Sequence, residues 1–227
     1  MELLEYEAKV AVILAVMYLF FKILLSKETF HRFNRALLVG TAILAFILPF
    51  CVITIHRTVE LPVNAAAPGM SEPLAADGNV WWAMALSAAY LAGVAVMLAR
   101  VITELFKVRN LIRSGEIREE EDGVRIAVLD SDVPPFSWMD WVVMSREDYE
   151  SGNSHILEHE KAHIRLGHSK YVLLVDVLAS MQWFNPAMWL LRSDLRAIYE
   201  YEADDAVLSR GADIKEYQYS LIIPISS

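Results

Sequence analysis

Three long apolar segments constrain the fold of this chain more than any other feature. They cover about residues 8–25, 36–55 and 80–102 of the 227. A helix needs about 20 residues to cross the hydrocarbon core of a bilayer, where the backbone must satisfy its own hydrogen bonds. The composition agrees, because 56% of the residues are apolar, more than in an ordinary soluble domain. The sequence therefore predicts a membrane domain of residues 1–106 with three transmembrane helices.

The charges around these segments predict their orientation. The first segment is preceded by Glu2, Glu5 and Glu7 and lacks a small-residue cleavage site after it, so we expect a retained helix rather than a signal peptide. Loop 56–79 contains a single arginine and no lysine. Basic residues follow the first and third segments instead: Lys27, Arg32, Arg35, Lys107, Arg109, Arg113 and Arg118. The positive-inside rule then places the N-terminus and loop 56–79 outside, and everything after the third segment in the cytoplasm.

The remaining chain divides into a charged connector at 107–123, which continues the third helix, and a cytoplasmic domain at 124–227. Segments 124–129 and 138–144 are rich in β-branched and aromatic residues, so they are expected to be strands of a small sheet. The edge of that sheet could bind a substrate strand or belong to a plain structural hairpin. The predicted fold class is mainly α.

A metal-binding pattern lies in the cytoplasmic part, where HEKAH at 159–163 is an H-E-x-x-H sequence. A break at Gly152 and the apolar pattern after it predict a helix. Residues four apart share a helix face, so His159 and His163 can reach one ion with Glu160 beside it. The pattern is typical of zinc peptidases, in which the glutamate is the general base for a metal-bound water. We expect one Zn²⁺ ion and catalysis by Glu160.

Two histidines and a water leave zinc one protein ligand short, and a second helix downstream could supply it. Residues 196–208 are predicted to be helical and carry four carboxylates. Glu200 and Asp204 share a face, whereas Glu202 points elsewhere. One of the two acids could bind zinc while the other accepts a hydrogen bond from a ligand histidine. The alternative is a solvated acidic helix face.

The apolar stretch 171–191 between these motifs is long enough to suggest a fourth span. A crossing would put the acidic helix and the histidines on opposite sides of the membrane, where they could not share an ion. Asp176 and an Asn-Pro break at 185–186 also divide the stretch into pieces too short to cross. We therefore predict a buried or membrane-apposed helix, a turn at the break, and then the acidic helix.

These motifs resemble the BlaR/MecR-type antirepressor family of integral-membrane zinc peptidases. The resemblance is carried by the apolar segments, HEKAH, WFNP at 183–186 and EYEADDAVL at 200–208, which is similar to the family's E-x-x-x-D-x-A-V-L stretch. It implies a gluzincin-like domain in the bacterial inner membrane, with Glu200 as third ligand and Asp204 behind a ligand. It also implies cleavage of the chain itself or of a transcriptional repressor after an external signal. The family's C-terminal sensor is not expected, because the sequence stops at Ser227.

Composition excludes two other functional classes. The single cysteine, Cys51, rules out an intrachain disulfide and a catalytic cysteine, and a buried structural thiol is expected. A formal charge of −9, without a basic face beyond the juxtamembrane cluster, argues against direct nucleic-acid binding. His168 is expected to form a structural hydrogen bond, with a role near the metal or substrate as the alternative.

The combined prediction is a membrane-embedded zinc metalloendopeptidase whose partners are the lipid bilayer and a protein or peptide substrate. The alternative is a catalytically silent signalling or scaffold protein of the membrane with a structural metal site. Glu160 favours the enzyme, because a structural site needs ligands but no general base.

Overall fold

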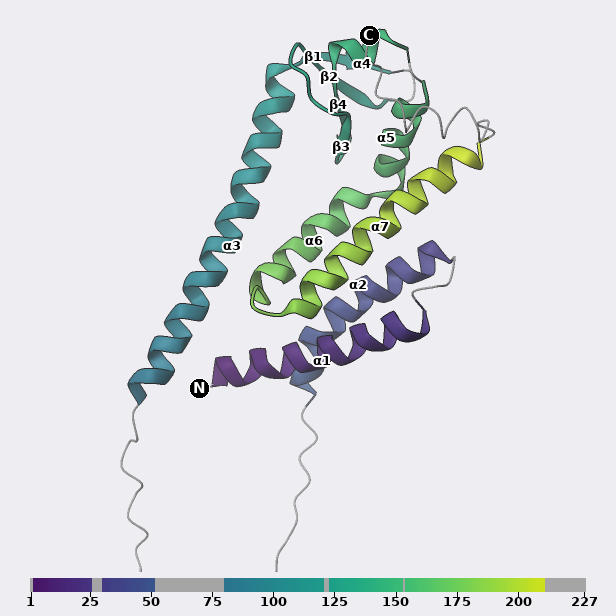
Figure 1. Cartoon of the computed structure of the whole chain (residues 1–227). Helices are drawn as coiled ribbons and strands as arrows, with labels where there is room; N and C mark the ends of the chain where they lie inside the picture. Colours follow the sequence, from purple (N-terminus) through teal and green to yellow (C-terminus); the bar gives the residue numbers. More distant parts are fainter. Residues whose placement is uncertain (1, 26–29, 52–79, 121–122, 153, 211–227) are drawn as a thin grey trace, which may run out of the picture.

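The computed structural model describes residues 2–25, 30–51, 80–120, 123–152 and 154–210, so the predicted outer loop 56–79 lies outside the described residues. The fold is mainly helical with one small sheet, as predicted (Figure 1). The elements in chain order are α1 (Glu2–Leu24), α2 (His31–Ile47), η1 (Leu48–Phe50), α3 (Val80–Ser114), β1 (Glu116–Glu119), β2 (Arg125–Leu129), β3 (Phe136–Trp138), β4 (Trp141–Ser145), α4 (Arg146–Glu150), α5 (Ser154–Leu166), α6 (His168–Met181) and α7 (Pro186–Leu208).

Two helical segments of the described chain, not the predicted three, are long and apolar enough to cross a membrane: His31–Phe50 and Trp81–Ser114. The prediction for segment 8–25 is wrong in this respect, because α1 carries charges near both of its ends. They are Glu2, Glu5, Glu7, Lys9 and Lys22. Glu7 is buried and accepts a hydrogen bond from Gln182 Nε2 at 2.6 Å. One face of α1 is therefore built to contact protein.

The second segment also differs from its prediction. Helix α2 begins at His31 and ends in the short η1 turn at Phe50. Cys51 follows this turn and is exposed, so the prediction of a buried thiol is wrong. Pro49 at the start of η1 lacks a backbone N–H, which explains why the α-helix does not continue through this point.

Helices α1, α2, α6 and α7 pack around one apolar core (Figure 1). All four helices contribute fully buried side chains, among them Leu14 of α1, Leu38 of α2, Val175 of α6, and Met188 and Leu191 of α7. Burying each such side chain stabilises the fold by about 1.5–3 kcal/mol relative to leaving it in water. The core therefore fixes α7 firmly against the N-terminal helices.

The apolar stretch between the two sequence motifs forms a helical hairpin. The side chain of Asn185 caps α7 by accepting a hydrogen bond from the Ala187 amide at 3.0 Å. Pro186 occupies the first helical position, where a missing N–H leaves no bond unmade. Helix α7 then runs back beside α6 and reaches α5 (Figure 1). The prediction of a turn at the Asn-Pro break is confirmed.

The sheet has the strand order β1-β2-β4-β3, with β2 and β4 parallel and the two outer pairs antiparallel. Strand β2 falls in the predicted segment 124–129. The predicted strand 138–144 is instead the end of β3 and most of β4, separated by a tight turn. Met139 makes this turn with a positive φ of 53°, and neither Gly nor Pro marks it in the sequence. Strand β1 lies in the segment predicted as connector.

The sheet is covered on both faces, and one of them positions α5. Four buried side chains point to α4 and α5: Ile126, Val128, Val142 and Met144. The other face, with Ala127, Leu129 and Val143, packs against Leu111 and Ile112 near the end of α3. The H-E-x-x-H helix is thus held between the sheet and α7.

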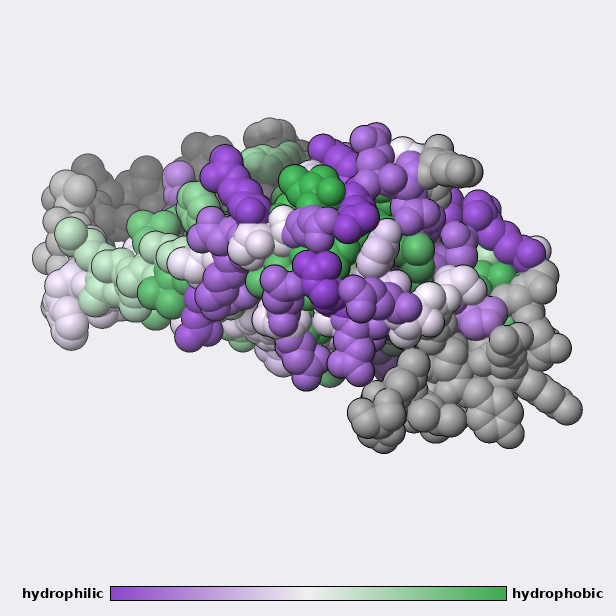
Figure 2. Space-filling model, turned by 90° about the horizontal axis from the view of Figure 1, so that it is seen from above, coloured by the Kyte–Doolittle hydropathy of each residue, from purple (hydrophilic) through white to green (hydrophobic). Residues whose placement is uncertain are grey.

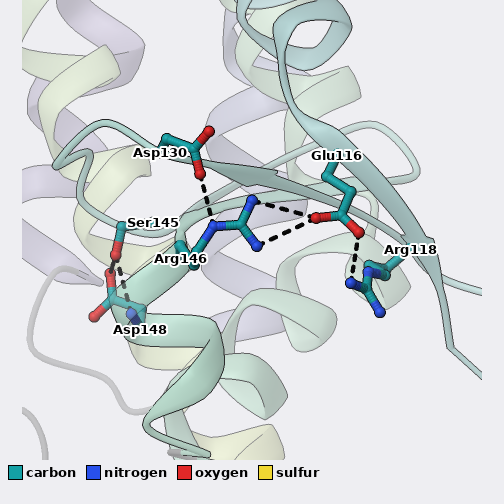
Figure 3. Close-up of polar contacts among 6 residues, drawn as sticks. All are labelled: Glu116, Arg118, Asp130, Ser145, Arg146 and Asp148. Carbon is teal, nitrogen blue, oxygen red and sulfur yellow. Dashed lines mark hydrogen bonds and ion pairs between the residues drawn. The ribbon is translucent and has the colours of Figure 1, made fainter.

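Charged side chains cover the outer end of the sheet. Arg146 contacts Asp130 at 2.6 Å and Glu116 at 3.2 Å, and the Ser145 hydroxyl caps α4 by accepting from the Asp148 amide (Figure 3). Seen from this end, hydrophilic residues dominate the middle of the surface (Figure 2). Such exposed ion pairs contribute little stability. They indicate that this end of the molecule faces water.

Candidate metal centre

His159 and His163 of α5 and Glu200 of α7 bring three ligand atoms together. The Nε2 atoms of the two histidines are 3.1 Å apart. Glu200 Oε2 lies 3.4 Å from His159 Nε2 and 3.8 Å from His163 Nε2. Each of these residues offers a ligand atom within 4.8 Å of the others. The structure therefore brings together the three residues that sequence analysis proposed as ligands.

Small residues at the contact between α5 and α7 make this approach possible. Ala162 and Ala203 are completely buried there, and Val207 packs beside them. Because neither alanine extends beyond Cβ, the two helices can lie close together. Glu200 is one turn before Ala203 and projects toward the histidines at the end of this contact, and its side chain is 62% exposed.

The three ligand atoms fit a zinc ion. Bonds of about 2.0–2.1 Å to a tetrahedral zinc place neighbouring ligand atoms about 3.3 Å apart. The observed separations of 3.1, 3.4 and 3.8 Å lie around this value. Two imidazole nitrogens and one carboxylate oxygen are also the donors of a common type of catalytic zinc site, which keeps its fourth position open.

Asp204 lies behind the first histidine. Its Oδ1 is 3.1 Å from Nδ1 of His159, the ring nitrogen that faces away from the other ligands. An acceptor at Nδ1 keeps the proton there and leaves Nε2 free for a metal. This contact gives Asp204 the geometry that sequence analysis expected for it.

The two histidines differ in pKa because their neighbouring charges differ. Burial opposes protonation of His159, but hydrogen bonds with Asp204 and Glu200 and the charge of Glu160 outweigh it and raise its pKa to about 9. Burial and the positive charge of His159 lower the pKa of His163 to about 4. The hydrogen bond with His159 lowers the pKa of Glu200. At neutral pH the metal-free centre therefore holds one protonated histidine among carboxylates.

These pKa values predict how zinc binding depends on pH. Zinc must displace the proton of His159, whereas His163 and Glu200 are already deprotonated at pH 7. Binding at pH 7 should thus release about one proton per zinc, and the apparent affinity should rise about tenfold per pH unit up to pH 9. Calorimetry in buffers of different ionisation enthalpy measures the released protons. Release of none would contradict the assignment of His159.

Glu160 lies beside the three ligand residues and lines the same cleft. Burial is the largest influence on its carboxyl group and raises its pKa, while hydrogen bonds from the Ser137 side chain and backbone and the charge of His159 oppose the rise. A general base works best when its pKa approaches the working pH. The raised pKa therefore shifts Glu160 in the direction that a general base at this centre would need.

The cleft has a volume of about 520 Å³ and lies between β3 and helices α5, α6 and α7. Its walls include Phe136 and Trp138 of β3, Val172 of α6, and Arg196 and Tyr199 of α7. Strand β3 is at the edge of the sheet, paired on one side with β4. The cleft thus joins a strand edge to the candidate ligands.

Some residues of the centre were not predicted as such. Ser137 lies in the part of β3 that the predicted strand did not include, and Arg35 was considered only as a topology signal. His168 forms the structural hydrogen bond expected for it, with Glu202, and it also contacts the ring of His163, as in the alternative of a role near the metal. Glu202 points away from the Glu200 face, as predicted, and is buried beside His168. Partners so far apart in the chain leave no local sequence signal.

This geometry agrees with a comparison to known proteins. Residues 140–224 match the family BlaR1 peptidase M56. The matched stretch starts at the turn before β4 and includes α5, α6 and α7 with both motifs. No curated protein matches the chain. The family match supports the resemblance that the motifs suggested and indicates a metallopeptidase of the BlaR1 type.

Proposed function

We propose that this chain is a membrane-embedded zinc endopeptidase with a gluzincin-like centre. His159, His163 and Glu200 bind the metal, Asp204 orients His159, and Glu160 is the general base. The observation that carries this proposal is the half-buried Glu160 carboxyl group beside three ligand atoms whose spacing suits one zinc ion. A site that only stabilised the fold would need no such acid.

The mechanism follows from the positions of these residues. When bound, zinc polarises a substrate carbonyl and increases the acidity of water. Glu160 takes a proton from the attacking water and passes it to the leaving amine. Ser137 donates hydrogen bonds to the Glu160 carboxylate, which holds this base at the wall of the cleft.

The substrate is proposed to be an extended segment of protein chain. Strand β3 forms one wall of the cleft and has β4 on one side. An extended peptide can add to such an edge through main-chain hydrogen bonds. This mode of binding tolerates many peptide sequences, because the main chain is the same in all of them. The scissile bond would then lie over Glu160 and the metal ligands. A proteolytic step of this kind on the chain itself or on a repressor would serve transmembrane signalling.

Proteolysis by the purified full chain tests the proposal. The protein in detergent is incubated with an unfolded test protein, and the fragments are identified by mass spectrometry. Cleavage that stops when a chelator removes the metal and resumes with added zinc is expected. A chain that binds zinc but cleaves neither the test protein nor itself would support the catalytically silent alternative.

The proposed orientation in the bacterial inner membrane predicts a labelling pattern. Cys51 lies at the outer end of the candidate span His31–Phe50 and is the only cysteine. A membrane-impermeant maleimide should therefore label it in intact spheroplasts. Ser151→Cys in a Cys51→Ser background is the matched control, and it should be labelled only after permeabilisation. The reverse pattern would overturn the orientation.

A further inference from the structure

The second candidate ligand, His163, begins a chain of contacts that ends on α2. Its Nδ1 lies 2.7 Å from Nδ1 of His168, and His168 Nε2 lies 3.0 Å from Oε2 of Glu202. Arg35 Nη1 lies 2.9 Å from the same Glu202 oxygen. The side chains of His168 and Glu202 are each only 3% exposed, and that of Arg35 is 15% exposed. Four side chains from α5, α6, α7 and α2 thus form one polar series, of which the two middle members, His168 and Glu202, are buried.

Metal binding at His163 would fix which partner donates and which accepts in each hydrogen bond of this series. Its Nε2 faces the other ligand atoms, so its proton must be on Nδ1. His163 therefore donates to His168, whose Nδ1 must accept. His168 then carries its own proton on Nε2 and donates it to Glu202. The contacts agree with this pattern at each step.

The far end of the series is fixed by charge and packing. A carboxylate as buried as that of Glu202 needs an ionic partner, and Arg35 supplies it. Arg35 also donates to the carbonyl of Leu166, the last residue of α5, at 3.3 Å. The ring of Tyr199 stacks on His168 with centroids 4.6 Å apart. His168 therefore has little freedom to rotate.

We propose that His168, Glu202 and Arg35 are positioning residues that orient the metal ligand His163, an inference that rests on the proposed function. His159 has a carboxylate directly behind it, in Asp204. His163 reaches its carboxylate through a second histidine. Because Arg35 belongs to the candidate membrane span His31–Phe50, the series also connects that span to the metal ligand.

Zinc affinity of the full chain in detergent tests the inference independently of hydrolysis. Competition with a chromophoric chelator gives Kd for wild type, His168→Phe, Arg35→Met and the double variant. Phenylalanine preserves a ring beside Tyr199 but cannot accept from His163. We expect His168→Phe to weaken zinc binding by about 10–100-fold, the range typical for partners of ligand histidines. Arg32→Met, an exposed arginine on the same helix, is the control and should bind zinc as wild type does.

The double variant separates positioning from general damage to the fold. If Arg35 acts through His168, the double variant should bind zinc no more weakly than His168→Phe alone. Losses that multiply, or a folded His168→Phe protein with wild-type affinity, would overturn the inference. If His168→Phe does not fold, the inference is tested with Arg35→Met and Arg35→Lys instead. Arg35→Met should weaken zinc binding, whereas Arg35→Lys, which keeps the charge beside Glu202, should retain most of the wild-type affinity. Wild-type affinity in both variants would overturn the inference. A wild-type chain without zinc affinity would instead overturn the proposed function.

Discussion

Replacing Glu160 by glutamine is expected to reduce peptide hydrolysis by about 10²–10⁴-fold while zinc remains bound, as for loss of a general base. The amide has the shape of the carboxylate but cannot take a proton from water. Ser137 can still contact it, and the three ligand residues are unchanged. Initial rates of cleavage and zinc content, measured on the same preparation, test both parts of this expectation.

A matched control is Glu158→Gln, on the same helix. Glu158 is partly exposed and pairs with Arg165 rather than with the centre. It should cleave as wild type does. Full activity of Glu160→Gln would remove Glu160 from the mechanism, whereas loss of zinc from this variant would mean that the residue acts as a ligand.

Truncating Glu200 to alanine is expected to have the largest effect on metal binding. Its carboxylate is the only one whose oxygen lies within 4 Å of both ligand Nε2 atoms among the described residues. The side chain is 62% exposed, so its removal leaves no cavity in the core. We expect loss of stoichiometric zinc, whereas the melting temperature of the metal-free protein should fall only slightly, because the carboxylate also pairs with His159.

Two further variants on α7 provide a comparison for the zinc affinity of Glu200→Ala. Asp204→Ala removes the acceptor behind His159 and should weaken zinc binding by about 10–100-fold. Asp205→Ala removes an exposed carboxylate on another face and should leave zinc binding unchanged. If Glu200→Ala kept zinc as firmly as wild type while Asp204→Ala lost it, the roles of the two acids would have to be exchanged.

The candidate ligands could be predicted because the residues of each motif have a spacing in the sequence that indicates a metal site. A four-residue separation on a helix decides that His159 and His163 share a face, and the same rule pairs Glu200 with Asp204. The need for one ion to reach both motifs then predicted the hairpin of α6 and α7. These inferences required only helix geometry and the sequence, whereas the choice of Glu200 rather than Asp204 as the third ligand came from the family resemblance.

The parts that could not be predicted depend on tertiary contacts. The hydrophobicity of segment 8–25 indicated a span, but Glu7 has its partner Gln182 far along the chain. Strand β1 is charged along its length and is defined by pairing with β2. Glu202 and Arg35 are far apart in the sequence, and only the folded chain brings them into contact. Local patterns contain none of this information.

Zinc-edge X-ray absorption of the purified full chain tests the central claim most directly. We expect one zinc per chain with nitrogen and oxygen ligands at about 2.0–2.1 Å, and scattering from two imidazole rings. His163→Ala should remove this spectrum. Zinc surrounded only by solvent oxygens, or a sulfur ligand at about 2.3 Å that must come from a cysteine or methionine, would contradict a centre made of His159, His163 and Glu200.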